Sequence, residues 1–439
     1  MSTTDEMTSR PVTHRDRKPE SAMSTGTDRQ GRPAEMDVLP PNQPSALYED
    51  SFGSKYPTAQ RFCHEAKKAW GSCFPHLFWV LPTLGVAAGL LQLNSLFVFV
   101  LNLVAVIPLS AMISSSCDEL GDHLGDLIGE LLSATFGNVV ELTAGVLGLI
   151  NADESFSQSV MIGSVLSDAL FVFGTCIIAA SYNKKVLFFN KAAAQALSSL
   201  MIITAITIIL PTTLYSTFPV LDLGDKIESF SRGTSIILLV LYIGYLYFHL
   251  VTHKHLFQSQ SQQNNDSDSD NDADSNNADN HPSGPFSPEI FLKPALHIAF
   301  AVTGTIVCTY LMYIHIPGTM QITSFSKTFI ALILVPIASN STEAAEVLAA
   351  ARNGDVDATI GMIVDSILQI SLFAIPFLVM LGWAIRQPMT LYFETSHTVI
   401  FFFSIMFVNH LLHDGRYMYI HGTMLVALYI VVVTTFYMD

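Results

Sequence analysis

Charged residues are scarce in this chain, because only 13% of its 439 residues are Asp, Glu, Lys or Arg. A soluble protein would carry about 25% charged residues, so a large soluble protein with buried core helices is disfavoured. Half of the residues are hydrophobic. They fall in blocks such as 75–93 and 417–438, each long enough for a helix to cross ~30 Å of hydrocarbon. The composition therefore predicts an all-α membrane protein whose main surroundings are a lipid bilayer.

Cysteine, nucleotide-binding and calcium-loop motifs are also lacking. The five cysteines are scattered without a CxxC pair, which supports neither a disulfide framework nor a zinc site. The sequence contains no glycine-rich phosphate-binding loop, so nothing in it points to a pump driven by a nucleotide. It also predicts no enzymatic activity and no cofactor. The net charge of −16 makes nucleic acid an unexpected partner. The aspartate-rich tract at 258–285 lacks the fixed glycine and glutamate of an EF-hand loop, so it is interpreted as a flexible acidic linker.

The hydrophobic blocks predict eleven transmembrane helices, six before the acidic tract and five after it. They are expected near 76–93, 95–115, 122–150, 157–181, 193–215, 230–252, 288–314, 325–351, 355–384, 391–412 and 417–438. The expected organisation is a disordered cytosolic tail (1–70), a first transmembrane helix (71–94), a five-helix repeat (95–257), the acidic linker (258–285) and a second five-helix repeat (286–439).

Basic residues near the predicted spans favour one orientation in the membrane. With the N-terminal tail in the cytosol, most lysines and arginines near the membrane face the cytosol, and only Lys226, Arg232, Lys327 and Arg386 face the other side. This asymmetry follows the positive-inside tendency. Eleven spans then place the C-terminus on the lumenal side.

One polar motif occurs twice within the hydrophobic region. The two copies read ATFGNVVELTAGVLGLI (134–150) and PIASNSTEAAEVLAAAR (336–352). Their alignment pairs Asn138 with Asn340 and Glu141 with Glu343, 202 residues apart. Within each copy the asparagine and glutamate are three residues apart, so on a helix they would face much the same way.

A second motif repeats at the same spacing, because Ser164 and Ser366 are also 202 residues apart. Two motif pairs at one spacing indicate an internal repeat. Five helices in each copy would give the two copies opposite orientations across the membrane. This is the inverted repeat of many secondary transporters, whose binding site lies near the midplane where the copies meet.

The repeated glutamates predict the chemistry of that site. An ionisable residue inside a membrane span is costly unless it is paired or faces water, and it marks function by default. Carboxylate, amide and hydroxyl oxygens suit calcium or another hard cation. Burial favours the protonated form of a carboxyl group that has lost its cation. Competition between a cation and a proton at one carboxylate is the physical basis of exchange.

Over residues 75–438 these motifs resemble the calcium/proton exchangers of the cation/calcium exchanger superfamily, especially the fungal vacuolar ones. The resemblance is carried by FGNVVEL (136–142), GSVLSD (163–168), SFSRGTS (229–235), SNSTE (339–343), DSILQISLFAIP (365–376) and the acidic tract. It implies an antiporter that exchanges cytosolic Ca²⁺ for protons across a vacuolar membrane by alternating access. It also implies that Glu141 and Glu343 bind the cation, with nearby oxygens from Asn138, Asn340, Ser164, Gln369 and the repeat mate Ser366.

Four positions depart from the family pattern. Where the family usually has glycine and histidine, this sequence has Ser339 and Ala344. Where the family usually has asparagine and glycine, it has Asp168 and Asp365. Asp168 is one helical turn from Ser164, and Asp365 is one turn from Gln369. Both aspartates are therefore expected to add carboxylates to the metal site, and such a set cannot all ionise without bound cations.

Several alternatives stay open. Asp365 and the nearby Glu346 could instead be steering charges in a cytosolic vestibule. The transported ion could be Mn²⁺, Na⁺ or K⁺ in place of Ca²⁺. The changes at positions 339 and 344 also make a transport-inactive, cation-sensitive membrane regulator conceivable. The sequence makes no prediction of the oligomeric state.

Overall fold

The computed structural model describes residues 79–124, 126–181, 187–188, 191–217, 224–249, 288–353 and 356–438. All of them belong to one unit of the chain, Lys68–Asp439. The predicted N-terminal tail (1–70) and acidic linker (258–285) lie outside the described residues.

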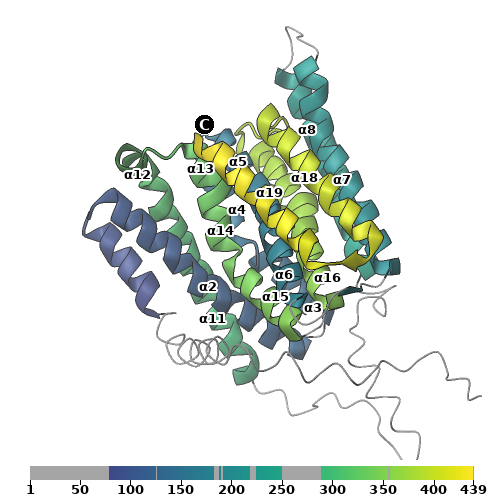
Figure 1. The fold of residues 1–439 in the computed structure, drawn as a ribbon. Coiled ribbons are helices and arrows are strands. Elements are labelled where there is room, and N and C mark those ends of the chain that lie inside the picture. Colours follow the sequence, from purple (N-terminus) through teal and green to yellow (C-terminus); the bar gives the residue numbers. More distant parts are fainter. Residues whose placement is uncertain are drawn as a thin grey trace, which may run out of the picture. The chain divides into compact units, whose positions relative to one another are not determined.

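The described residues are almost entirely helical (Figure 1). Before the linker the helices are Trp79–Leu90, α2 (Ser95–Leu124), α3 (Asp126–Phe136), α4 (Val139–Ile150), α5 (Glu154–Leu166), η1 (Ser167–Val172), α6 (Phe173–Ala180), α7 (Lys191–Thr217) and α8 (Gly224–Tyr247). After it they are α11 (Pro288–Ile314), α12 (Ile316–Thr323), α13 (Lys327–Phe329), η3 (Ile330–Leu334), α14 (Val335–Ser339), α15 (Ser341–Asn353), α16 (Val356–Gln369), η4 (Ile370–Ala374), α17 (Ile375–Ile385), α18 (Thr395–Asp414) and α19 (Tyr419–Met438). Two short strands, β1 (Leu187–Phe188) and β2 (Arg416–Tyr417), pair antiparallel.

Within the described ranges, eight helices are long and apolar enough to cross a membrane, or nine if one bent pair counts as a single span. That pair is α12 with the helix Lys327–Ser339, and the bend between them is 115°. The chain therefore has the fold of a helical membrane protein with about eight apolar spans. Trp79–Leu90 and α4 are apolar but shorter, so the count of eleven stays a prediction.

The two motif segments are interrupted, although the sequence predicts a continuous helix for each. Asn138 lies between α3 and α4, and Asn340 lies between α14 and α15. Asparagine favours caps and turns over helix interiors because its side chain competes for nearby backbone groups. Apolar residues continue on both sides of each break, so the hydropathy pattern of the sequence does not reveal the breaks. Each break places a glutamate, Glu141 or Glu343, in the first turn of the helix that follows.

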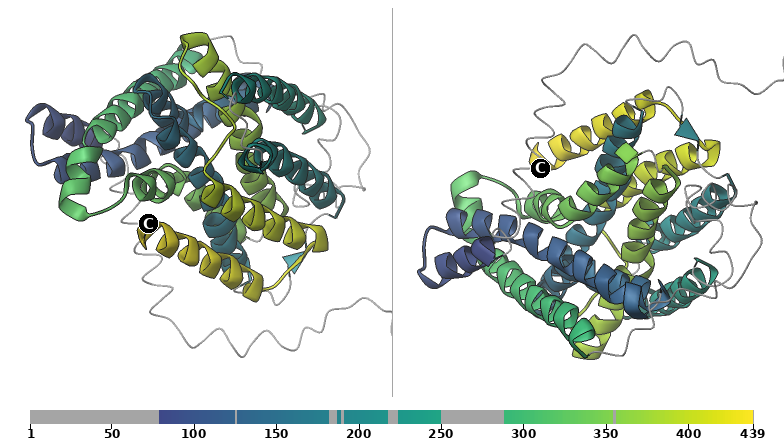
Figure 2. Two further views of the ribbon diagram at one scale, coloured as in Figure 1. Left: turned by 90° about the horizontal axis from the view of Figure 1, so that it is seen from above. Right: turned by 90° about the horizontal axis from the view of Figure 1, so that it is seen from below.

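The spans differ in how deeply they are enclosed by their neighbours. The compared quantity is the share of residues that are buried in the most apolar stretch of each span. This share is 83% in Glu154–Ala180 and 72% in Val356–Ile385, but only 28% in α19. These two enclosed spans lie at the centre of the bundle. Figures 1 and 2 show α2 and α11 side by side at its periphery. Both central spans also contain a π-helical segment, η1 or η4.

A close backbone approach joins the central helices. Gly163 of α5 packs against η3, where a Cβ at this position would lie 2.1 Å from the carbonyl oxygen of Leu332. Only a residue without a side chain fits there, so Gly163 brings the two halves of the chain together beside Ser164.

We expect Gly163→Ala to destabilise the protein by about 1–3 kcal/mol or more, because backbone atoms must shift to admit the methyl group. Gly361→Ala is the matched control, since a Cβ there meets open space within α16 and alanine favours a helix by about 1 kcal/mol. Thermal unfolding of the detergent-solubilised variants measures both. Equal unfolding temperatures would contradict the close packing of α5 on η3.

Candidate cation site

Glu141 lies at the centre of the bundle and is only 2% exposed to solvent. The Ser164 hydroxyl of α5 donates a hydrogen bond to Glu141 Oε1 at 3.1 Å. The Ser339 hydroxyl, at the end of α14, also hydrogen-bonds to this carboxylate. The first predicted glutamate therefore receives hydrogen bonds from both halves of the chain.

Glu343 repeats this arrangement in the second half. The Ser366 hydroxyl of α16 lies 3.0 Å from Glu343 Oε2, as Ser164 lies beside Glu141. The serine–glutamate contact thus occurs twice at the spacing of the sequence motifs. The exposure of the two glutamates differs, because Glu141 is buried and Glu343 is partly exposed.

Asp168 connects the two halves directly and is 1% exposed. Asn340 Nδ2 donates to Asp168 Oδ1 at 2.6 Å, and the Ser366 hydroxyl lies 2.9 Å from Asp168 Oδ2. Ser366 is therefore within hydrogen-bonding distance of two carboxylates, Asp168 and Glu343. Its single proton can serve only one of them at a time.

The two asparagines complete the network. Asn340 Oδ1 lies 3.0 Å from the Ser164 hydroxyl and 3.2 Å from the Ser339 hydroxyl, and each hydroxyl has a single proton to share between Asn340 and Glu141. Asn340 Nδ2 also donates to the Ser164 carbonyl oxygen at 3.1 Å. Asn138 Nδ2 donates to Gln369 Oε1 at 3.1 Å. Eight of the nine predicted site residues thus contact at least one other member of the set.

The ninth, Asp365, faces another part of the molecule. Its carboxylate accepts a hydrogen bond from the Tyr245 hydroxyl, and its Oδ2 lies 3.9 Å from His249 Nε2. Glu346 likewise points elsewhere, with its Oε2 3.3 Å from the Ser114 hydroxyl of α2. The structure therefore does not bring Asp365 into the serine–asparagine network.

The electrostatics of the network require positive charge. No ion pair joins Glu141, Asp168 or Glu343 to a basic side chain in the part of the chain that the structure describes. The helix N-termini of α4 and α15 favour a negative charge on their first-turn glutamates, by about 0.3–1 kcal/mol each. This is small beside the cost of placing three carboxylates together when Glu141 and Asp168 are buried, so the charge must be balanced by bound cations or protons.

The oxygen donors suit a hard divalent cation. Among the described residues, however, no three His, Cys, Asp or Glu side chains converge into a ready metal site. Hydroxyl and amide donors hold the carboxylates in this conformation, so a cation that bound here would have to displace some of these hydrogen bonds.

The network also contains one residue that the sequence analysis did not place in the site. Ser339 appeared there only as a departure from the family glycine, yet its hydroxyl contacts both Glu141 and Asn340. Its position beside a motif asparagine was the signal that its hydroxyl could join these contacts. The contacts of Asp365 with α8 had no such signal in the sequence.

A bundle of apolar helices whose central carboxylates have no basic partner in the described part of the chain is typical of an ion transporter of the membrane. The chain belongs to the sodium/calcium exchanger protein family, whose model matches residues 94–251 and 293–438. It is 33% identical over 369 residues to the vacuolar calcium ion transporter of Schizosaccharomyces pombe. This alignment covers 83% of this chain and 85% of the relative. It is 30% identical to vacuolar cation/proton exchanger 2 of Oryza sativa subsp. japonica, over 78% of this chain and 76% of the relative.

Solved structures share the fold. The structure of native YfkE aligns with a TM-score of 0.69 at 22% identity, covering 84% of this chain and 100% of that one. A crystal structure of the H⁺/Ca²⁺ exchanger CAX aligns with a TM-score of 0.61 at 15% identity, covering 85% and 88% of the two chains. The fold is therefore that of a known class of membrane transporter.

Proposed function

We propose that this protein is a secondary antiporter that exchanges cytosolic Ca²⁺ for protons across a vacuolar membrane. The observation that carries the proposal is the mirrored pair of contacts, Glu141 with Ser164 and Glu343 with Ser366, within the bundle. The names of the relatives in fission yeast and rice support the ion, the coupling and the compartment.

The proposed architecture is one N-terminal helix followed by two inverted five-helix repeats, eleven transmembrane helices in all, with a cytosolic N-terminus and a lumenal C-terminus. The two motif breaks, at Asn138 and Asn340, support the repeat. So do the π-helical segments, because η1 begins at Ser167 and η4 begins one residue after the equivalent Gln369.

The proposed cation ligands are oxygens from both repeats. Glu141, Glu343 and Asp168 supply charge, and the neutral oxygens come from Asn138, Asn340, Ser164, Ser366 and Gln369. Ca²⁺ takes six to eight oxygens, which this set can provide. When Ca²⁺ leaves, protons take its place on the carboxylates, so that each ion drives the release of the other.

We assign Asp365 and Glu346 to the cytosolic side of this site. Asp365 is partly exposed and bonded to α8, while Glu346 is exposed and bonded to α2. Both lie near enough for their charges to act on Glu343. In this role they attract cations toward the site without entering the coordination shell.

Helices pack closely on both sides of the two motif breaks. On the cytosolic side of the breaks, α3 packs on α2 through Gly121 and Gly129. On the lumenal side, Leu378 of α17 fills the space beside Gly145 of α4, where a Cβ would lie 2.5 Å from Leu378 Cδ1. Alternating access requires the lumenal contacts to open after the cation has bound.

Uptake by purified protein in proteoliposomes tests this function. An acidic interior should drive ⁴⁵Ca²⁺ uptake without ATP, and nigericin, which collapses the pH gradient, should abolish it. Uptake of Mn²⁺, Na⁺ or K⁺ without Ca²⁺ would change the assigned ion. The absence of any proton-linked flux would leave the cation-sensitive regulator as the better interpretation.

A further inference from the structure

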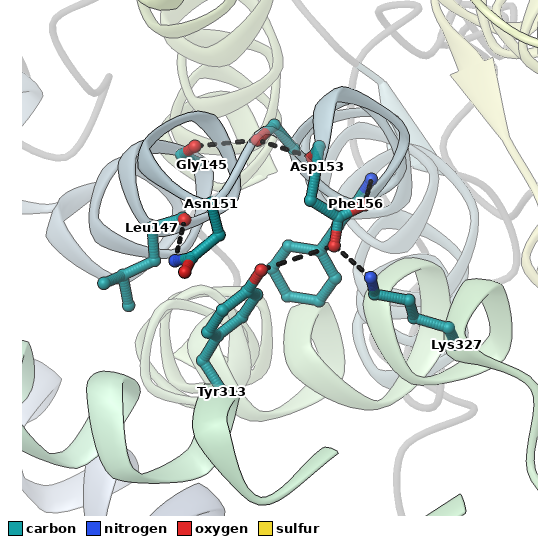
Figure 3. Close-up of polar contacts among 8 residues, drawn as sticks. Gly145, Leu147, Asn151, Asp153, Phe156, Tyr313 and Lys327 are labelled. Atoms are coloured by element: carbon teal, nitrogen blue, oxygen red, sulfur yellow. Dashed lines mark hydrogen bonds and ion pairs between the residues drawn. The ribbon is translucent and has the colours of Figure 1, made fainter. Parts of the chain in front are cut away.

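Two consecutive acidic residues lie at the start of α5, the cap Asp153 and the first helical residue Glu154, and both reach the second half of the chain. Asp153 caps α5 by accepting from the Phe156 backbone N–H at 3.4 Å. The same carboxylate forms an ion pair with Lys327 at the start of α13 and accepts from the Tyr313 hydroxyl of α11 at 3.3 Å. Figure 3 shows the Asp153 carboxylate between the Tyr313 hydroxyl and the Lys327 ammonium group.

Additional packing supports the ion pair. Lys327 Nζ lies 5.9 Å from the centre of the Phe156 ring, a cation–π geometry. The edge of the Phe156 ring meets the Tyr313 ring at a centroid distance of 5.0 Å. The cap of α5, the ion pair and the ring contacts therefore form one unit that joins α5 to α11 and α13.

Glu154 makes a parallel connection to a different segment. Its Oε1 accepts hydrogen bonds from both the backbone N–H and the hydroxyl of Thr390, each at 2.7 Å. Gln158, one turn later in α5, donates to the carbonyl oxygens of Thr390 at 3.0 Å and Tyr392 at 3.1 Å.

Thr390 belongs to the connection between α17 and α18, which is partly buried. Leu391 and Phe393 of this connection are 0% and 1% exposed. Hydroxyls of two further helices also hold it, because Ser231 of α8 accepts from the Leu391 N–H and Thr212 of α7 accepts from the Phe393 N–H. The connection is therefore a buried strap fixed at the same end of α5 as the ion pair.

We propose that Asp153 and Glu154, with Lys327 and Thr390, form a latch that holds the lumenal end of the transport pathway closed. The inference rests on the proposed function, which requires this end to open. Both acidic residues lie on the first half and both partners on the second, so separation of the halves at this end breaks both contacts. The latch thus favours the cytosol-facing state, and its release precedes delivery of the cation to the lumen.

A cysteine reporter tests the latch without requiring transport. Ala374 is fully buried in η4, which packs against α5, so Ala374→Cys should react slowly with a small maleimide. The reporter is placed in a folded background in which alanine replaces the native cysteines Cys63, Cys73, Cys117, Cys176 and Cys308. We expect Lys327→Gln to raise the labelling rate ~2- to 5-fold, as for a partly exposed ion pair. Glu154→Gln should raise it roughly 3- to 10-fold by weakening charge-assisted hydrogen bonds.

A double-mutant cycle assigns the effect to the ion pair. Asp153→Asn retains a good helix cap, and the double variant Asp153→Asn with Lys327→Gln should label no faster than the faster single variant, because both changes remove one interaction. Lys226→Gln, an exposed lysine assigned to the same side, should leave the rate unchanged. Labelling at the unmodified rate in both Lys327→Gln and Glu154→Gln, or additive effects in the double variant, would overturn the latch. Calcium uptake by the unmodified protein, measured separately, distinguishes such a result from failure of the proposed function.

Discussion

Glutamine in place of Glu141 or of Glu343 is expected to abolish calcium/proton exchange while the protein stays folded. Glutamine has the size of glutamate and can still accept the hydrogen bond from Ser164 or Ser366. It cannot supply the negative charge or take up the exchanged proton. A charged contact is worth about 1.5–3 kcal/mol, so loss of cation binding alone should lower uptake at limiting Ca²⁺ by roughly 10- to 100-fold, and loss of the proton acceptor removes the coupled step.

Proteoliposome uptake measures this effect, and thermal unfolding with and without Ca²⁺ provides a second readout. Bound Ca²⁺ should raise the unfolding temperature of the unmodified protein but not of the two variants, because only binding to the folded state adds stability. Glu346→Gln is the matched comparison, since Glu346 lies one turn after Glu343 but is exposed and contacts Ser114. Loss of this steering charge should lower uptake only at low salt. Full uptake by either Glu141→Gln or Glu343→Gln would refute the site.

Asp168→Asn is expected to weaken Ca²⁺ binding without abolishing exchange. Asparagine can keep the shape of the contacts, because its Oδ1 can accept from Asn340 and its Nδ2 can donate to the Ser366 hydroxyl. The loss is then one negative charge in a site of low dielectric. We expect Ca²⁺ affinity to fall by about 10-fold or more, with maximal uptake largely retained.

The concentration dependence of ⁴⁵Ca²⁺ uptake checks this expectation. Asp365→Asn serves as the comparison, because Asp365 carries the same charge but is bonded to Tyr245 outside the network. Its removal should have a smaller effect that disappears at high salt, as expected of a steering charge. An unchanged affinity in Asp168→Asn would show that Asp168 only links the helices.

The centre of this site could be predicted from sequence because its information is local and repeated. The equal spacing of Asn138 with Asn340 and of Ser164 with Ser366 identified the elements that meet. The cost of burying a glutamate predicts that they bind a cation. The membrane class followed from composition alone. The structure adds that Asp168 faces the network. Its position one helical turn after Ser164 predicted this orientation.

The remaining features depend on information that hydropathy does not contain. The break at Asn340 lies within a long predicted span, and an apolar pattern has the same appearance on either side of a bend. Helix α12 occupies residues that looked like a simple connection, although Pro317 in its first turn is a favourable helix start. The orientation of Asp365 toward Tyr245 depends on where α8 lies, which no local spacing predicts.

The hydrogen bonds of Asp168 have a consequence for how the chain is made. Both of its donors, Asn340 and Ser366, follow it by 172 and 198 residues, beyond the acidic tract. A ribosome therefore completes the first half of the protein before either donor exists, so the carboxylates of Asp168 and Glu141 must wait in the membrane without most of their final partners. During that interval protonation or contact with water must reduce the cost of their burial. Assembly of the second half then supplies the donors, so the site becomes complete only when nearly the whole chain has been inserted.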